Sequence, residues 1–149
     1  MWVWDARRML STVAVGTDGS VTAAEAVKAA AEIAQRFDAK LVLLSAFQKS
    51  SQPVSLGGQS TELQWATNPD ARVRELLHRT EQDLLDRHIE CTTMVDEGDP
   101  AEVLTRLAEE CDADLLVIGN QGMQRRVLGS VPNSVTHKAP CSVYVVKTT

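Results

Sequence analysis

The stretch Asp114-Leu115-Leu116-Val117-Ile118-Gly119 is the most hydrophobic of the segments that can form a strand, and it ends in glycine. An apolar run of this length is typical of a strand that is buried on both faces of a parallel sheet. The β-branched run from Thr12 to Gly16 has the same character and also ends in glycine. We therefore expect these two runs to be strands of one parallel sheet.

Further strands and helices are predicted on either side of these two runs. Thr22 and Glu25 have the spacing of a capping box at the start of the first helix, where an apolar stripe at helical period follows. Asp99 and Glu102 repeat that spacing at the third helix, and Pro100 suits its first turn. The other predicted strands are residues 40–46, 90–95 (a partly exposed edge) and 142–146, and the predicted helices are residues 22–37, 69–87, 100–111 and 130–138.

Strands and helices therefore alternate along the whole chain. Right-handed crossovers that each carry a helix imply an α/β fold, with a doubly wound five-stranded parallel sheet and helices on both faces. We expect the strand order 3-2-1-4-5 and a single domain over residues 11–149, preceded by an extension over residues 1–10. In such a sheet, ligands bind beyond the carboxyl ends of the strands where the winding reverses, which here are the first and fourth strands.

The composition excludes several classes of function. The 149 residues carry a net charge of −5, which argues against a nucleic-acid partner, because such proteins present clustered basic surface. Residues 1–10 are too short and too charged for a signal peptide or a membrane-spanning helix, so we expect a cytoplasmic protein with no membrane partner. The three cysteines and three histidines show no metal-ligand or redox spacing, so no metal site is expected.

Glycine-containing loops follow both the first and the fourth predicted strand. The first is Gly16-Thr17-Asp18-Gly19-Ser20, and the second is Gly119-Asn120-Gln121-Gly122, which leads to Gly129-Ser130 at a helix start. Glycines allow backbone amides to approach an anion, and a helix amino terminus favours phosphate. Glycines in such loops also serve as plain turn residues, and Asp18-Gly19-Ser20 suits a turn and a helix cap equally well. The Gly-Lys-Ser/Thr signature of a Walker A loop is absent.

Several motifs together resemble the universal stress protein family. They are Ala14-Val15-Gly16-Thr17-Asp18-Gly19-Ser20, the strand at 114–119, Gly129-Ser130-Val131-Pro132 and Ala139-Pro140-Cys141, and the resemblance runs from about Ser11 to the carboxyl terminus. The resemblance implies a protein that binds an adenine nucleotide rather than a dedicated enzyme. The site residues that it implies are Gly16, Thr17 and Asp18 near the nucleoside, Ser45 and Ala46 at the adenine, and Ile118, Gly119, Asn120, Gly122, Gly129, Ser130 and Val131 around the ribose and phosphates.

The phosphate loop departs from the family pattern in one respect. The nucleotide-binding branch carries Gly-x2-Gly-x9-Gly-Ser/Thr, whereas this chain has six residues between Gly122 and Gly129. The shorter loop has less backbone to wrap a third phosphate, so AMP or cyclic AMP becomes a candidate beside ATP, with which Mg²⁺ would bind. Independently of the family, we expect Arg125 and Arg126 to compensate phosphate charge, although a solvated surface pair is an alternative.

The last predicted strand resembles the edge through which family members form dimers. We expect a homodimer through Val143 and Val145, because an exposed hydrophobic edge strand otherwise risks uncontrolled association. The alternative is a monomer, in which the charge of Lys147 discourages this edge strand from pairing with another chain.

Three functional hypotheses follow from the sequence. The first is a nucleotide-binding regulator of the stress response. The second is a slow ATPase or self-phosphorylating protein with Ser130 or Thr17 as acceptor, although no general base or phosphate-loop lysine is evident. The third is a nucleotide-free dimeric scaffold. A flavodoxin-like protein would have similar winding, but the first loop lacks the hydroxyl residues of a flavin phosphate site.

Overall fold

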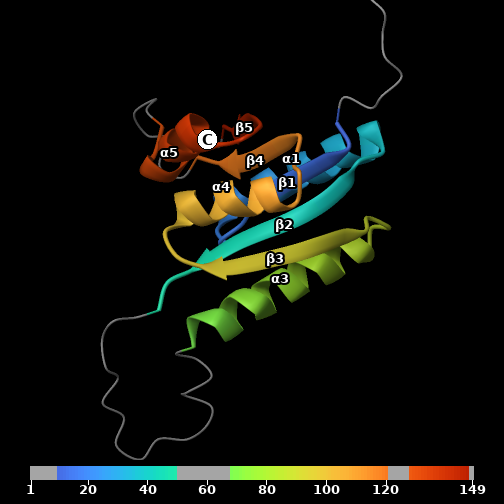
Figure 1. Ribbon diagram of the computed structural model, residues 1–149. Coiled ribbons are helices and arrows are strands. Elements are labelled where there is room, and N and C mark those ends of the chain that lie inside the picture. The colour runs from blue at the N-terminus through green and yellow to red at the C-terminus, as the bar shows by residue number, and fades with distance from the viewer. Residues whose placement is uncertain (1–9, 50–67, 121–127, 148–149) are drawn as a thin grey trace, which may run out of the picture.

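Five parallel strands form one sheet in the order β3-β2-β1-β4-β5, with helices packed against it (Figure 1). This computed structural model describes residues 10–49, 68–120 and 128–147. It confirms the predicted fold class and strand order. The strands are β1 (Thr12–Gly16), β2 (Lys40–Phe47), β3 (Cys91–Glu97), β4 (Leu115–Gly119) and β5 (Ser142–Val146), and the helices are α1 (Val21–Phe37), α3 (Pro69–Leu85), α4 (Pro100–Glu110) and α5 (Ser130–Lys138).

Each face of the sheet is covered by two helices, and this arrangement explains the continuous apolar runs. Along β1, Val13 and Val15 pack into the cluster beneath α1 and α3, whereas Ala14 packs into the cluster beneath α4 and α5. Successive side chains of a strand point to opposite faces, so a strand covered on both sides needs an unbroken apolar sequence. All three residues have no exposed surface. The apolar runs at β1 and β4 therefore identify inner strands.

The helix starts show which residues act as caps. Ser20 caps α1, because its hydroxyl accepts a hydrogen bond from the Ala23 N–H at 3.1 Å. The predicted cap at Thr22 is therefore wrong by two residues, and Thr22 lies inside the first turn of a helix that begins at Val21. At α4 the predicted cap is confirmed, since the Asp99 carboxylate accepts from the Glu102 N–H at 3.3 Å.

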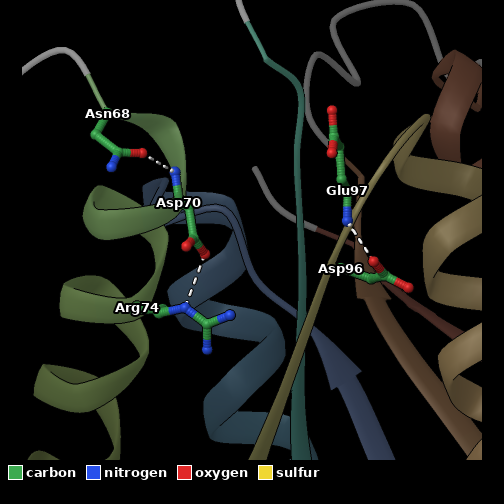
Figure 2. Close-up of polar contacts among 5 residues, drawn as sticks. All are labelled: Asn68, Asp70, Arg74, Asp96 and Glu97. Carbon is green, nitrogen blue, oxygen red and sulfur yellow. Dashed lines mark hydrogen bonds and ion pairs between the residues drawn. The ribbon is translucent and has the colours of Figure 1, made fainter.

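Polar contacts at the start of α3 are drawn in Figure 2. The Asn68 side-chain oxygen accepts from the Asp70 N–H at 3.2 Å, and the Asp70 carboxylate accepts from Arg74 Nε at 2.8 Å. The helix ends at Leu85 rather than near Arg87. Leu85, in the last turn of α3, is 49% exposed. These contacts set where the helix begins, but exposed ion pairs of this kind add little stability.

A second set of contacts lies at the end of β3. The Asp96 carboxylate accepts from the Glu97 N–H at 2.8 Å, as Figure 2 shows, and also from Arg106 Nη2 of α4 at 2.7 Å. The backbone hydrogen bond from Glu97, followed by the contact with Arg106, lowers the pKa of Asp96. These contacts hold the end of the edge strand against α4.

The three cysteines are partly buried free thiols, and burial raises the pKa of each. For Cys91 the pKa rises from 9.0 to about 11. Because the thiolate is the reactive form, we expect Cys91 to react with iodoacetamide at pH 8 roughly a hundredfold more slowly than an unperturbed thiol. Mass spectrometry of alkylated protein over a pH series measures this rate. Alkylation of Cys91 at the rate of free cysteine would contradict the raised pKa.

The described part of the chain lacks two features, a membrane-spanning helix and a metal-binding cluster. None of its helices is both long and apolar enough to cross a bilayer. In the same ranges, no group of three or more histidine, cysteine, aspartate or glutamate side chains is arranged to hold a metal ion.

Candidate functional site

The winding of the sheet reverses between β1 and β4, and a cavity of about 240 Å³ lies at their carboxyl ends. Three segments of the chain that are far apart in sequence meet there: the loop after β1, the end of β2, and the start of α5 with the end of β4. The cavity is lined by Gly16, Thr17, Asp18, Ser20, Thr22, Ala23, Ser45, Ala46, Pro100, Leu104, Ile118, Gly119, Gly129, Ser130, Val131 and Pro132. All predicted site residues within the described ranges except Asn120 are in this lining.

Two hydrogen bonds fix the loop after β1 against β2. The Thr17 N–H donates to the Leu44 carbonyl at 2.9 Å, and the Ser45 hydroxyl donates to the Thr17 carbonyl at 2.7 Å. Thr17 and Ser45 are both buried. The side-chain oxygen of Asp18 accepts from the Ser20 N–H at 2.9 Å, which forms the turn that leads into α1. The loop is therefore shaped before any ligand arrives, and the exposed Asp18 carboxylate lies at the cavity.

Substitution of Ser45 by alanine tests this preformed shape. The variant leaves the buried Thr17 carbonyl without its hydroxyl donor, so we expect the free energy of unfolding to fall by about 1–2 kcal/mol. Urea denaturation measures this change. Ser11→Ala is a matched control, because Ser11 is exposed, and should change stability by less than about 0.5 kcal/mol. Equal stability of the two variants would show that the hydroxyl contact does not hold the loop.

Gly119 forms the floor of the cavity where β4 meets the start of α1. A Cβ atom at this position would lie 2.6 Å from Thr22 Cγ2 and 2.7 Å from the Thr22 carbonyl oxygen. The backbone of α1 therefore approaches β4 as closely as a glycine allows. At Gly16 a Cβ would instead meet the end of the Leu104 side chain at 2.9 Å. The glycine that ends β4 is required by this close approach.

The amino terminus of α5 forms the opposite wall. Gly129 is the N-cap residue and makes no side-chain capping bond, and Ser130 and Val131 of the first turn line the cavity. The first N–H groups of a helix have no partner within the helix, and the helix dipole is positive at this end. The arrangement therefore favours an anionic group beside Ser130 and Val131.

The charge of the described lining is low. Asp18 is the one carboxylate in it, and lysine and arginine are absent from this lining. Within these residues, the groups suited to meet an anion are therefore backbone N–H groups and hydroxyls. Gly122, Arg125 and Arg126, which were also predicted as site residues, lie outside the described residues.

Asn120 was predicted to contact the nucleotide, but it lies behind the cavity wall. Its side chain is completely buried, and its side-chain oxygen accepts from the Gly129 N–H at 2.9 Å. Its backbone N–H donates to the Val146 carbonyl at 3.3 Å. Asn120 therefore connects the ends of β4 and β5 with the start of α5.

Sequence reasoning missed several lining residues: Ser20, Thr22, Ala23, Pro100, Leu104 and Pro132. Ser20 and Pro132 belong to two of the motifs that resemble the family, so the motifs themselves are the signal that could have identified them. Pro100 and Leu104 carry no chemical signal, because they belong to the start of α4, which reaches the cavity through its packing on β2, β3 and α5.

Larger cavities occur elsewhere, and one of about 540 Å³ shares Thr17 and Ser20 with this cavity but includes no residue of β4. One of about 770 Å³ is formed at the amino-terminal ends of β2 and β3 by residues that include Lys40, Leu85 and Cys91. This is the opposite end of the strands, where parallel sheets do not usually place ligands. It also includes no helix amino terminus. The smaller cavity beyond β1 and β4 is therefore the candidate site.

The β5 edge is the other feature that the sequence singled out. Val143 and Val145 are partly buried against the cluster beneath α4 and α5, whereas Tyr144 is 46% exposed. In the sheet, β5 pairs with β4 and forms one of the two edges. The two valines therefore contribute to the monomer's own core, and the part of the edge open to a partner is its backbone and Tyr144.

Comparisons with known proteins find relatives that share this fold. A family model described as the universal stress protein family matches residues 9–147. A universal stress protein of Mycobacterium tuberculosis is 36% identical over 144 residues, which cover 93% of this chain and 97% of that protein. A crystal structure of a universal stress protein in complex with cAMP has a TM-score of 0.73 at 30% identity and covers 95% of this chain and 99% of the other. An Arabidopsis thaliana family protein with AMP bound shares the fold, with a TM-score of 0.74 at 20% identity and coverage of 93% and 92%.

Proposed function

Since this chain belongs to the universal stress protein family, we propose that it binds an adenine nucleotide of low charge, AMP or cyclic AMP, as a cytoplasmic regulator of the stress response. The observation that carries the proposal is the cavity between β1 and β4, which gathers the predicted residues of three segments beside the amino terminus of α5. The similar protein with bound cAMP supports the same ligand class.

The described residues suggest how such a ligand would lie. The backbone of Ser45 and Ala46 at the end of β2 would contact the adenine, and the exposed Asp18 carboxylate would accept hydrogen bonds from ribose hydroxyls. The N–H groups of Ser130 and Val131 would donate to the phosphate, which the α5 dipole also favours. In this orientation one phosphate reaches the helix end.

Low ligand charge is proposed because the described lining offers little to neutralise three phosphates. Its one ionisable group is Asp18, which repels an anion. The contributions of Gly122, Arg125 and Arg126 to phosphate binding remain predictions. If ATP binds, these arginines and a Mg²⁺ ion on the phosphates would have to supply the compensating charge.

Calorimetry on nucleotide-free protein tests the proposal. AMP, cyclic AMP, ATP and adenosine are each titrated, and nucleotide released from freshly purified protein by denaturation is identified by chromatography. We expect micromolar binding of AMP or cyclic AMP and weaker binding of ATP. ATP bound at least about tenfold more tightly than AMP would refute the preference for low charge. Empty protein without measurable heat would instead favour the nucleotide-free scaffold.

We also propose that the protein binds its ligand without efficient turnover. A general base must reach the proton that it removes, and the described lining offers only the Asp18 carboxylate for that role. A phosphate-release assay with ATP measures turnover directly. Phosphate release much faster than the spontaneous hydrolysis of ATP in buffer alone would support the slow ATPase hypothesis instead.

A homodimer through β5 is the second part of the proposal. The free backbone edge of β5 and the exposed Tyr144 offer a surface that pairing of two copies would cover. Sedimentation equilibrium should therefore give twice the mass of the 16.2 kDa chain. The chain mass itself, at concentrations up to about 100 µM, would contradict the dimer.

A further inference from the structure

Asn120 lies where three segments meet, at the ends of β4 and β5 and the start of α5. Its side chain has no exposed surface, and its side-chain oxygen accepts the Gly129 N–H at 2.9 Å. A buried amide is costly unless it is hydrogen-bonded, so the position is specified by its polar contacts rather than by hydrophobic packing. The two residues are nine positions apart, and their bond joins the end of β4 to the start of α5.

The backbone of Asn120 is itself fixed. Its N–H donates to the Val146 carbonyl at 3.3 Å, which continues the β4–β5 pairing one residue beyond Gly119 and Val146. The side chain therefore acts on Gly129 from a point that is anchored to the sheet. Asn120 engages the Gly129 N–H, and the next two residues, Ser130 and Val131, line the cavity. Their N–H groups belong to the first turn of α5, where N–H groups have no partner within the helix.

We propose that Asn120 is a positioning residue, which holds the amino terminus of α5 at the distance from β1 and β4 that a bound phosphate group requires. This inference rests on the proposed function, because it assigns the phosphate end of that same site. Asn120 does not line the cavity and acts through Gly129. The neutral amide supplies the acceptor oxygen without adding a negative charge behind the phosphate position.

The proposal predicts a selective loss in Asn120→Leu, which removes the acceptor and keeps the number and branching of the side-chain heavy atoms. The affinity for AMP should fall roughly tenfold, because the helix end that holds the phosphate is no longer fixed. The affinity for adenosine should change less than about twofold, because the nucleoside is held at β1 and β2. The ratio of AMP affinity to adenosine affinity is therefore the decisive quantity, since general loosening of the fold would weaken both ligands.

Two further variants serve as controls. Asn133→Leu makes the same change at an exposed position of α5 and should leave both affinities unchanged. Asn120→Asp keeps an acceptor oxygen for the Gly129 N–H and should retain adenosine binding, while its added charge weakens AMP binding.

Hydrogen exchange of the Gly129 amide, followed by NMR without ligand, tests the contact independently of any nucleotide. In the native sequence we expect this amide to exchange at least about tenfold more slowly than an unprotected amide. Protection should persist in Asn120→Asp and be lost in Asn120→Leu. If Asn120→Leu does not fold, the native protein and Asn120→Asp still decide the question.

The outcomes separate this inference from the proposed function. If native protein binds no AMP but Gly129 is protected through Asn120, the proposed function fails and the positioning contact stands. If AMP binds but Gly129 exchanges freely in the native protein, the role of Asn120 is refuted. Equal losses of AMP and adenosine affinity in Asn120→Leu would likewise overturn it and leave Asn120 as a residue of general stability.

Discussion

Replacement of Gly119 by alanine is expected to lower the free energy of unfolding by about 3 kcal/mol and to abolish measurable AMP binding. The added Cβ would lie 2.6 Å from Thr22 Cγ2 and 2.7 Å from the Thr22 carbonyl oxygen. A side chain can rotate away from such a clash, but the carbonyl belongs to the first turn of α1. The turn must therefore move away from β4, and the cavity that both segments line must change shape.

Gly16→Ala is the matched control for this prediction, because Gly16 ends β1 as Gly119 ends β4. Its Cβ would meet the terminal carbons of Leu104 at 2.9 and 3.2 Å, and these atoms can shift by side-chain rotation. We expect a loss of about 1 kcal/mol, measured for both variants by urea denaturation alongside calorimetry with AMP. Equal stability of the two alanine variants would contradict the prediction, because it would show that the Thr22 backbone moves away from the added Cβ as readily as the Leu104 side chain.

Substitution of Ser130 by proline is expected to weaken AMP binding by roughly 10- to 100-fold, while the fold is retained. Proline removes the backbone N–H that faces the proposed phosphate position. It is favoured at the first helical position, and the preceding Gly129 already has the extended backbone, with ψ of 170°, that a residue before proline requires. The variant therefore deletes one donor with little change to α5.

Ser130→Ala separates the backbone donor from the hydroxyl. It removes the hydroxyl alone, so its affinity for AMP should fall by no more than about fivefold. Calorimetry with AMP and with adenosine on both variants gives the comparison. If Ser130→Pro binds AMP as tightly as the unmodified chain, the phosphate does not lie at the amino terminus of α5. Equal weakening of adenosine binding would point to a disturbed fold instead.

The strands and most helix bounds could be predicted from sequence because their signals are local. The β1 and β5 ranges and the bounds of α5 agree with the structure, since apolar runs and turn residues mark them. Errors occur where several residue types compete locally. Ser20 rather than Thr22 caps α1, because the cap falls on the residue that follows the turn and not on the one with the best downstream spacing. Phe37, the last residue of the predicted helix and of α1, is 51% exposed.

The candidate site was predictable to the extent that it consists of motif residues. Gly16, Thr17 and Asp18 follow one strand and Gly119 another, and the rule for parallel sheets places both loops at one edge. The role of Asn120 was not predictable, because its contact with Gly129 crosses nine positions and depends on how α5 packs. Pro100 and Leu104 reach the cavity for the same reason.

The sequence by itself determined the family, the order of strands and helices, and the end of the sheet at which a ligand should bind. These follow from local residue patterns and from motifs, which need no knowledge of packing. Only the tertiary structure shows that Gly119 must be a glycine and that Asn120 contacts Gly129 without lining the cavity. It also shows that the described lining carries a single charge. Each of these depends on which distant residues come within a few ångströms, and hydrophobic burial of two helices on each face of the sheet sets those distances.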